Sequence, residues 1–307
     1  MNILRRLSLA SVLVALGTVL LGSWTRINGA GMTCPDWPLC HGMLIPSMAD
    51  GTIWEWTHRV FAFCVAPLVV GVMIAAWRVR DRSPFITPAL GVIGALFIVQ
   101  CLLGAATVHL SNSPASVVLH WGTAMAFVAS LCAMALFASD RSESRATPDA
   151  SRGEMVTVGI LGGTALVTYV TMCVGAYVSS SGDGLACLSI PGCAGHVVVY
   201  TQGQFLQMMH RSIAAAALLC AVSSFAFAWM RPASTRVRVA TSAGLALIFV
   251  QIVLGLLNVA LRLPMDLREA HAFNAALVFL AFVIATLLAT LDTRAALAAE
   301  SGGLTES

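Results

Sequence analysis

The sequence predicts an all-α integral membrane protein in which eight transmembrane helices form two pseudo-symmetric four-helix bundles. Three observations predict this fold: an apolar composition, eight apolar stretches of membrane-spanning length, and an internal repeat. Of the 307 residues, 58% are hydrophobic and only 10% are charged, whereas about a quarter of the residues in a soluble domain are charged. The net charge of +3 is too small to indicate a nucleic-acid partner. Because the composition is so apolar, the expected surroundings are a lipid bilayer.

The apolar stretches are long enough to cross a bilayer as helices, which takes roughly 20 residues. Each is bounded by polar or arginine-containing segments, so eight separate spans are expected. They cover residues 7–25, 55–77, 86–109, 115–138, 155–178, 204–229, 237–260 and 268–291.

Arginines are distributed unevenly between the two sets of connecting segments. All 17 basic residues are arginines, and 12 of them fall on one side of the predicted spans. These are Arg5, Arg6, Arg78, Arg80, Arg82, Arg141, Arg145, Arg152, Arg231, Arg236, Arg238 and Arg294. Only Arg26, Arg59, Arg211, Arg262 and Arg268 fall on the other. The positive-inside rule then places both termini in the cytoplasm and the loops 26–54 and 179–203 outside.

The chain contains an internal repeat with a spacing of about 150 residues. Four segments of the first half recur in the same order in the second: 21–42 as 174–195, 54–59 as 206–211, 99–110 as 250–261, and 119–124 as 270–275. Because each half has four spans, both halves have the same orientation and are expected to be related by a two-fold axis along the membrane normal. The predicted division is a half at 1–139, a linker at 140–153, a half at 154–294 and a flexible cytoplasmic tail at 295–307.

Four of the seven histidines belong to the repeat: His58 corresponds to His210, and His120 to His271. All four are expected one or two turns below the outer surface, on spans that enter from outside. Ionisable groups inside a membrane are costly and usually functional, and facing histidines on bundle helices suit bis-imidazole ligation of haem iron. The structural alternative is a hydrogen bond to a neighbouring helix.

An arginine follows the histidine in the second span of each half, at Arg59 and Arg211. A guanidinium group there could bind a haem propionate through paired hydrogen bonds, or it could extend to the lipid interface. A di-iron centre, which also uses Glu-x-x-His motifs, is excluded because too few carboxylates lie near the membrane to complete it.

The two halves differ at Glu55, which corresponds to Gln207. Iron ligation alone therefore does not require the acid. A carboxylate one turn from a metal-binding histidine is placed for acid–base chemistry or for stabilising a cation, although an ion pair with Arg59 is a structural alternative. We infer a catalytic N-terminal half and a cofactor-holding C-terminal half.

Each outer loop carries two cysteines with five residues between them, at Cys34 and Cys40 and at Cys187 and Cys193. Outside the cytoplasm such pairs form stable disulfides that close the loops. For Cys34 and Cys40, in the catalytic half, the alternative is a redox role beside the haem as a thiol relay or electron acceptor.

These motifs resemble those of the haem A synthase family. The segment TRINGAGMTCPDWPLCHG followed by EWTHR, then LHWGTA, MMHR and EAHAF, is similar to the family pattern over about residues 10–290. The second loop, CLSIPGC, lacks the Asp-Trp of the first, and RINGAG departs from the pattern Thr-Gly-Ser-Gly.

The resemblance implies an oxidoreductase that converts the C8 methyl group of haem O to a formyl group, making haem A for terminal oxidases. It implies that His58 and His120 flank the substrate haem O, that His210 and His271 ligate a haem b cofactor, and that Glu55 is the essential acid. Cys34 and Cys40 correspond to the family's loop cysteine pair.

The same resemblance implies a location in the inner (plasma) membrane. The partners it implies are haem O synthase, terminal oxidase assembly factors and an unidentified electron-transfer partner, and homo-oligomer formation is left open. The rival interpretation is a non-enzymatic dihaem b cytochrome that passes electrons between quinol and an outer partner, which does not explain Glu55. A transporter with parallel repeats ranks lower, because its polar groups are expected near the midplane.

Overall fold

The computed structural model describes residues 1–139, 151–190, 192–193, 195, 199–231 and 233–303. Eight helices span most of this length: α1 (Asn2–Ile27), α2 (Thr52–Arg78), α3 (Ile86–His109), α4 (Pro114–Phe137), α5 (Ser151–Ser180), α6 (Gln202–Met230), α7 (Thr235–Ala260) and α8 (Met265–Gly303). All eight contain stretches long and apolar enough to cross a membrane. The predicted all-α membrane fold is therefore confirmed.

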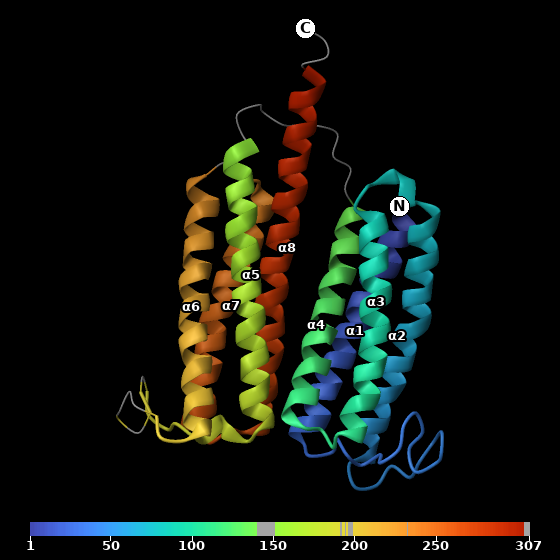
Figure 1. Cartoon of the computed structure of the whole chain (residues 1–307), viewed down its shortest axis with the longest axis vertical. Helices are drawn as coiled ribbons and strands as arrows, with labels where there is room; N and C mark the ends of the chain where they lie inside the picture. The colour runs from blue at the N-terminus through green and yellow to red at the C-terminus, as the bar shows by residue number, and fades with distance from the viewer. Residues whose placement is uncertain (140–150, 191, 194, 196–198, 232, 304–307) are drawn as a thin grey trace.

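The helices form two bundles that stand side by side, α1 to α4 in one and α5 to α8 in the other (Figure 1). They meet where α4 contacts α5 and where α1 and α4 contact α8. Phe279 and Leu280 of α8 join the apolar core of the first bundle, alongside Val69, Met125 and Leu131. Both termini lie at the same end of the molecule, as the sequence predicts for an even number of spans (Figure 1). The two-fold axis itself stays a prediction, with which this arrangement is compatible.

Local signals explain where several helices begin. Ser113 precedes α4 and its Oγ accepts a hydrogen bond from the backbone N–H of Ser116, with Pro114 at the first helical position. Thr201 and Ser234 cap α6 and α7 in the same way. Such caps bind backbone N–H groups that have no partner within the helix.

Small polar residues lie along the buried face of α1. Ser11, Thr18 and Thr25 each donate a hydroxyl hydrogen bond to the carbonyl four residues earlier. Their polarity is thereby satisfied within the helix, while their small size allows close helix packing, as is common in membranes. The large apolar side chains instead cover the outside, as at Leu102 and Leu219, where lipid is the solvent.

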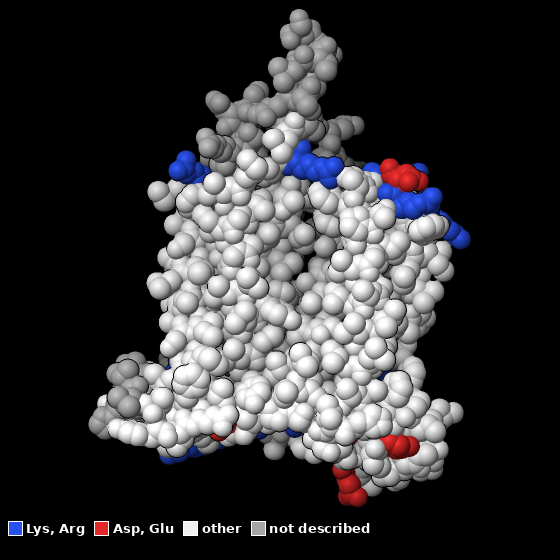
Figure 2. All heavy atoms as spheres, viewed as in Figure 1, with Lys and Arg blue, Asp and Glu red and all other residues white. Residues whose placement is uncertain are grey.

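Figure 2 shows a broad uncharged band with arginines gathered at the end that carries the termini. The predicted linker and the predicted tail each overlap a helix. Of the predicted linker 140–153, residues 140–150 lie outside the described residues, and α5 begins at Ser151. In the predicted tail 295–307, α8 continues to Gly303.

Candidate functional site

The four repeated histidines lie at similar positions in their helices. His58 on α2, His120 on α4 and His271 on α8 lie six residues after the helix start, and His210 on α6 lies eight residues after it. At a rise of about 1.5 Å per residue, all four are roughly two turns into the apolar layer, all at the end opposite the termini. The predicted common depth is thus present in the structure.

A glycine on the preceding helix packs against each of these imidazoles. A Cβ atom added to Gly22 or Gly175 would lie 2.6 Å from Cε1 of His58 or 2.7 Å from Cε1 of His210. The corresponding distances for Gly104 and Gly255, against His120 and His271, are 3.3 and 3.2 Å. Glycine therefore allows each odd-numbered helix to approach the ring of the next helix.

The sequence interpretation missed these four glycines, although the repeat contains them. Gly22 recurs as Gly175, and Gly104 recurs as Gly255. A repeated glycine in a helix interior, where it costs about 1 kcal/mol relative to alanine, indicates a close approach.

In both halves a glutamine contacts the second histidine of the pair. The Nε2 atom of Gln100 lies 3.2 Å from Nδ1 of His120, and Nε2 of Gln251 lies 3.1 Å from Nε2 of His271. The Oε1 atom of Gln251 accepts a hydrogen bond from Asn274 Nδ2 at 2.8 Å. The buried Oε1 of Gln100 has no hydrogen-bond partner. The N-terminal pair thus keeps a free buried acceptor.

The histidine pair of the second bundle fits a haem iron. The ring centres of His210 and His271 are 6.5 Å apart, with the ring planes at 72°. An imidazole nitrogen binds a first-row metal at about 2 Å and the ring centre lies about 1 Å further back, so this spacing would allow His210 and His271 to hold a haem iron between them. In addition, Nδ1 of His271 is buried without a partner, as expected of a polar site built for a ligand.

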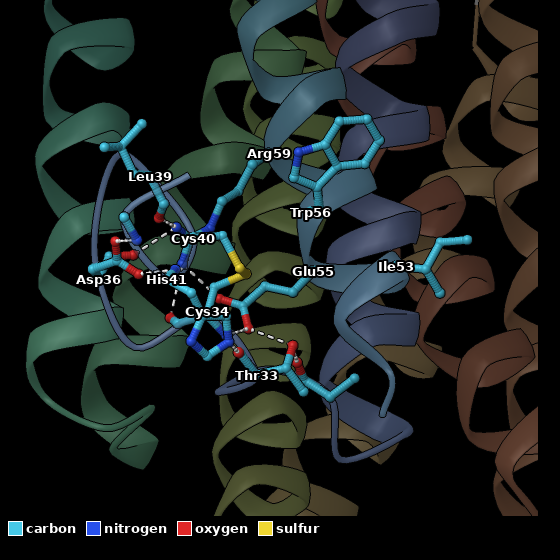
Figure 3. Close-up of a disulfide and its surroundings, with 12 residues drawn as sticks. Thr33, Cys34, Asp36, Leu39, Cys40, His41, Ile53, Glu55, Trp56 and Arg59 are labelled. Carbon is cyan, nitrogen blue, oxygen red and sulfur yellow. Dashed lines mark hydrogen bonds and ion pairs between the residues drawn. A yellow bond between two sulfur atoms is a disulfide. The ribbon is translucent and has the colours of Figure 1, made fainter. Parts of the chain in front are cut away.

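Glu55 lies in the first turn of α2, buried at 5% exposure, beneath the first cysteine loop (Figure 3). Its Oε1 forms an ion pair with Arg59 NH2 at 2.7 Å. Its Oε2 accepts hydrogen bonds from the backbone N–H of Cys34 at 2.9 Å and from Thr33 Oγ1 at 3.1 Å. The ion pair considered as the structural alternative is therefore present, and the carboxylate also anchors the loop.

Arg59 holds the same loop through backbone carbonyls. Its guanidinium donates to the carbonyl oxygens of Cys34, Asp36 and Leu39, as Figure 3 shows. Together with the ion pair to Glu55, these bonds fix the loop over the N-terminal end of α2.

Arg211 does the same in the second half, donating to the carbonyl oxygens of Cys187, Ser189 and Gly192. The predicted contact of Arg59 and Arg211 with haem propionates stays a prediction, and the structure gives both groups a further role in shaping the loops.

Both cysteine pairs form disulfides, Cys34 with Cys40 and Cys187 with Cys193. All four cysteines are buried, with exposures of 2% or less. The predicted staples are therefore present. In the first loop, Cys40 is further fixed by paired backbone hydrogen bonds with Met43.

Asp36, inside the first disulfide loop, organises the backbone that follows it. Its carboxylate accepts hydrogen bonds from the backbone N–H groups of Gly42 at 2.8 Å and His41 at 2.6 Å. The backbone N–H of Gly42, followed by that of His41, holds the pKa of Asp36 below its ordinary value because these bonds favour the charged form.

Of the three histidines outside the repeat, the structure describes His41 and His109. His41 is an exposed loop residue whose Nε2 lies 2.8 Å from the carbonyl oxygen of Thr33. His109 is the last residue of α3. His196 lies outside the described residues.

Fold and site together define a polytopic α-helical membrane protein with a pair of membrane-buried histidines in each bundle and a disulfide-closed loop at the end of each. The family model for cytochrome oxidase assembly proteins, COX15-CtaA, matches residues 5–52 and 48–283. The chain therefore belongs to this family.

Curated relatives agree with this assignment. The haem A synthase of Bacillus licheniformis is 29% identical, over 90% of this chain and 92% of its own length. The haem A synthases of Bacillus pumilus and Shouchella clausii are each 32% identical, over 72% and 74% of this chain and 73% and 75% of their own lengths. The family resemblance found in the motifs is confirmed.

Proposed function

We propose that this chain is a haem A synthase, an oxidoreductase that converts the C8 methyl group of haem O to a formyl group. The relatives of that name match the chain over most of its length, and the eight helices agree with a family that acts in membranes. The single observation that carries the assignment of chemistry is Glu55, a buried carboxylate three residues before His58, where the other half has Gln207.

In this proposal one histidine pair binds the substrate haem and the other binds the cofactor haem. His58 and His120 would hold haem O as substrate in the half formed by residues 1–139. His210 and His271 would hold haem b as a cofactor in the half formed by residues 154–294, as their ring spacing allows. Haem b bound by two histidines would supply electron transfer, since its iron has no free coordination position.

Glu55 would act as the proton acceptor for water attacking the substrate. The ion pair with Arg59 and the hydrogen bonds from Cys34 and Thr33 fix the carboxylate in one orientation, and a carboxylate held in this way can serve as a positioned proton acceptor. The reacting methyl group lies at the edge of the macrocycle. A carboxylate one helix turn before the proposed ligand His58 is therefore suitably placed to reach it.

The main role of the disulfide between Cys34 and Cys40 would be to hold Glu55 in position. It closes the loop whose Cys34 N–H binds Glu55, so the staple preorganises the acid. A redox role for the same pair, as an electron acceptor, is the alternative that a double serine substitution tests.

The orientation proposed for the chain places both termini in the cytoplasm and the cysteine loops outside the plasma membrane. The arginines at the end that carries the termini support it (Figure 2), because basic residues are retained on the cytoplasmic side. The product would serve terminal oxidases, and haem O synthase and oxidase assembly factors are the partners expected from this role.

Haem extraction tests the function directly. The chain is expressed in a host that supplies haem O and lacks its own haem A synthase, and extracted haems are separated and weighed by mass spectrometry. We expect haem A or its hydroxylated precursor only when the chain is present. Haem b alone, with haem O unchanged, would instead identify a non-enzymatic cytochrome.

A further inference from the structure

A pocket of about 540 Å³ lies between α1, α2 and α8. None of the four repeated histidines lines it. Aromatic side chains form much of its wall, from Trp24 on α1, Trp54 and Phe61 on α2, and Phe273 on α8. Its volume falls within the range of about 300–1,000 Å³ typical of small-molecule sites. Trp54 and Phe61 are 40% and 41% exposed, so the pocket can be entered from the lipid.

Two of the lining residues, Trp24 and Glu269, carry polar atoms of opposite hydrogen-bonding character behind this apolar wall. The Nε1–H of Trp24 is a donor and Oε1 of Glu269 is an acceptor, and both atoms are buried without a partner. The other oxygen of Glu269 is fixed, because Ser23 Oγ donates to Oε2 at 2.7 Å. Buried polar groups are normally paired, so two unpaired groups in the lining residues of one pocket indicate a ligand that carries a donor and an acceptor and that reaches them by small movements of these side chains.

Two of the lining residues are direct neighbours in sequence of proposed functional residues, one in each half of the chain. Trp54 immediately precedes Glu55 on α2, and Ala270, which also lines the pocket, immediately precedes His271 on α8. A redox-active ligand here would lie between the helix that carries the proposed catalytic acid and the helix that carries a proposed haem b ligand.

We propose that this pocket binds the ring of a quinone or quinol, the two-electron carriers that dissolve in membranes. A quinone carbonyl would accept the hydrogen bond from Trp24 Nε1, and a quinol hydroxyl would in addition donate to Glu269 Oε1. The aromatic wall suits a flat ring, and the lipid opening leaves room for the carrier's tail.

The redox balance rests on the proposed function. Conversion of a methyl group and one water to a formyl group releases four electrons and four protons. Two quinones take up these electrons and protons and leave as two quinols. Glu269 Oε1 lies where a proton would be exchanged with the quinol hydroxyl.

The repeat supplies a matched control. Trp24 corresponds to Tyr177, and Glu269 corresponds to Val118. The second copy therefore has no carboxylate at the equivalent position, and Tyr177→Phe removes a polar atom at the counterpart of Trp24 while leaving the pocket intact.

The test is photolabelling of the purified full-length, haem-loaded protein in lipid nanodiscs with an azido derivative of decylubiquinone. Unlabelled decylubiquinone competes, and labelled peptides are identified by mass spectrometry. We expect labelling within α1, α2 or α8, and a half-competing concentration about five-fold higher in Trp24→Phe and in Glu269→Leu, the effect of one lost hydrogen bond. Tyr177→Phe should compete as the unaltered protein does.

The proposal fails if labelling is not competed by decylubiquinone, if labels fall elsewhere, or if neither variant changes the competition. It also fails if haem O displaces the label while decylubiquinone does not, because the pocket would then hold the isoprenoid chain of the substrate. Binding is measured without turnover, so this result is separate from haem O conversion.

Discussion

The N-terminal ends of α2 and α6 have nearly the same architecture and differ in one hydrogen-bond acceptor. In both, an arginine donates to the carbonyl of the first loop cysteine, and a side chain three residues before the histidine accepts the N–H of that cysteine. The acceptor is the carboxylate of Glu55 in one half and the amide of Gln207 in the other. The amide alone therefore suffices to hold such a loop, and the charge of Glu55 needs another explanation.

The second difference concerns the glutamines beside the histidines. Gln251 is fixed by Asn274, whereas Thr123 takes the place of Asn274 in the first half and Gln100 keeps an unpaired oxygen. In the second half it is the glutamine that is fully hydrogen-bonded, whereas Nδ1 of His210 and Nδ1 of His271 are buried without a partner. The two halves therefore differ in which buried polar atom is left unpaired, the glutamine oxygen in the first half and the imidazole nitrogens in the second.

The largest contrast is expected from the histidines. His271→Ala should remove nearly all haem b from the purified protein because one of two iron ligands is lost, whereas His120→Ala should leave haem b content within about 20% of normal, a bound set by the two intact ligands. Pyridine haemochrome spectra measure both. Equal loss of haem b in the two variants would contradict the division between the halves.

The next largest difference between the two halves is expected when their disulfides are removed. Replacing Cys34 and Cys40 by serine should slow haem O conversion about ten-fold, because the N–H that binds the charged Glu55 is no longer fixed. The same change at Cys187 and Cys193 should slow conversion less than about two-fold. Rates are taken from haem A formed over time at equal protein content. If both double variants behaved alike, the positioning role would be wrong.

A smaller effect is expected from a methyl group placed against a histidine. In Gly175→Ala the new Cβ would overlap His210 Cε1 at 2.7 Å, so the ring must shift and haem b occupancy should fall by about half or more. Gly163→Ala, on the same helix with nothing within 4 Å, is the control and should stabilise the helix by up to about 1 kcal/mol. Haem-to-protein absorbance ratios and thermal unfolding report both, and unchanged occupancy in Gly175→Ala would exclude a tight fit.

The smallest effect is expected at Asp36. Its folded-state pKa is lowered by the N–H groups of Gly42 and His41, so its stabilisation of the loop is present at neutral pH and is lost as the pH falls through that lowered pKa. Asp36→Asn should remove this acid dependence. Hydrogen exchange of the loop amides followed by mass spectrometry measures it, and identical pH profiles in the two proteins would contradict the assignment.

Hydropathy predicts the eight helices well, because bilayer thickness sets their length whatever the tertiary contacts. It underestimates α8, which continues past the apolar stretch to Gly303, since backbone hydrogen bonding does not require apolar side chains. The histidines and Glu55 are identified by comparing the two copies of the repeat.

The loop contacts of Glu55 and Arg59 with backbone N–H and C=O groups could not be predicted, because they depend on the conformation of the loop rather than on residue type. The glycines and glutamines that contact the histidines carry a readable signal, namely their recurrence in both copies. The pocket between α1, α2 and α8 has no such signal, because it arises from packing between bundles.

Exchanging the two residues that distinguish the halves tests the central claim most directly. The double variant Glu55→Gln with Gln207→Glu keeps an acceptor for each cysteine N–H and moves the carboxylate to the other half. Extracted haems are analysed from this protein, from each single variant and from the unaltered chain. We predict normal haem b content in all four, conversion of haem O reduced at least about 100-fold wherever Glu55 is replaced, and near-normal conversion in Gln207→Glu alone. Normal conversion of haem O by the exchanged protein would contradict the assignment of catalysis to the N-terminal half.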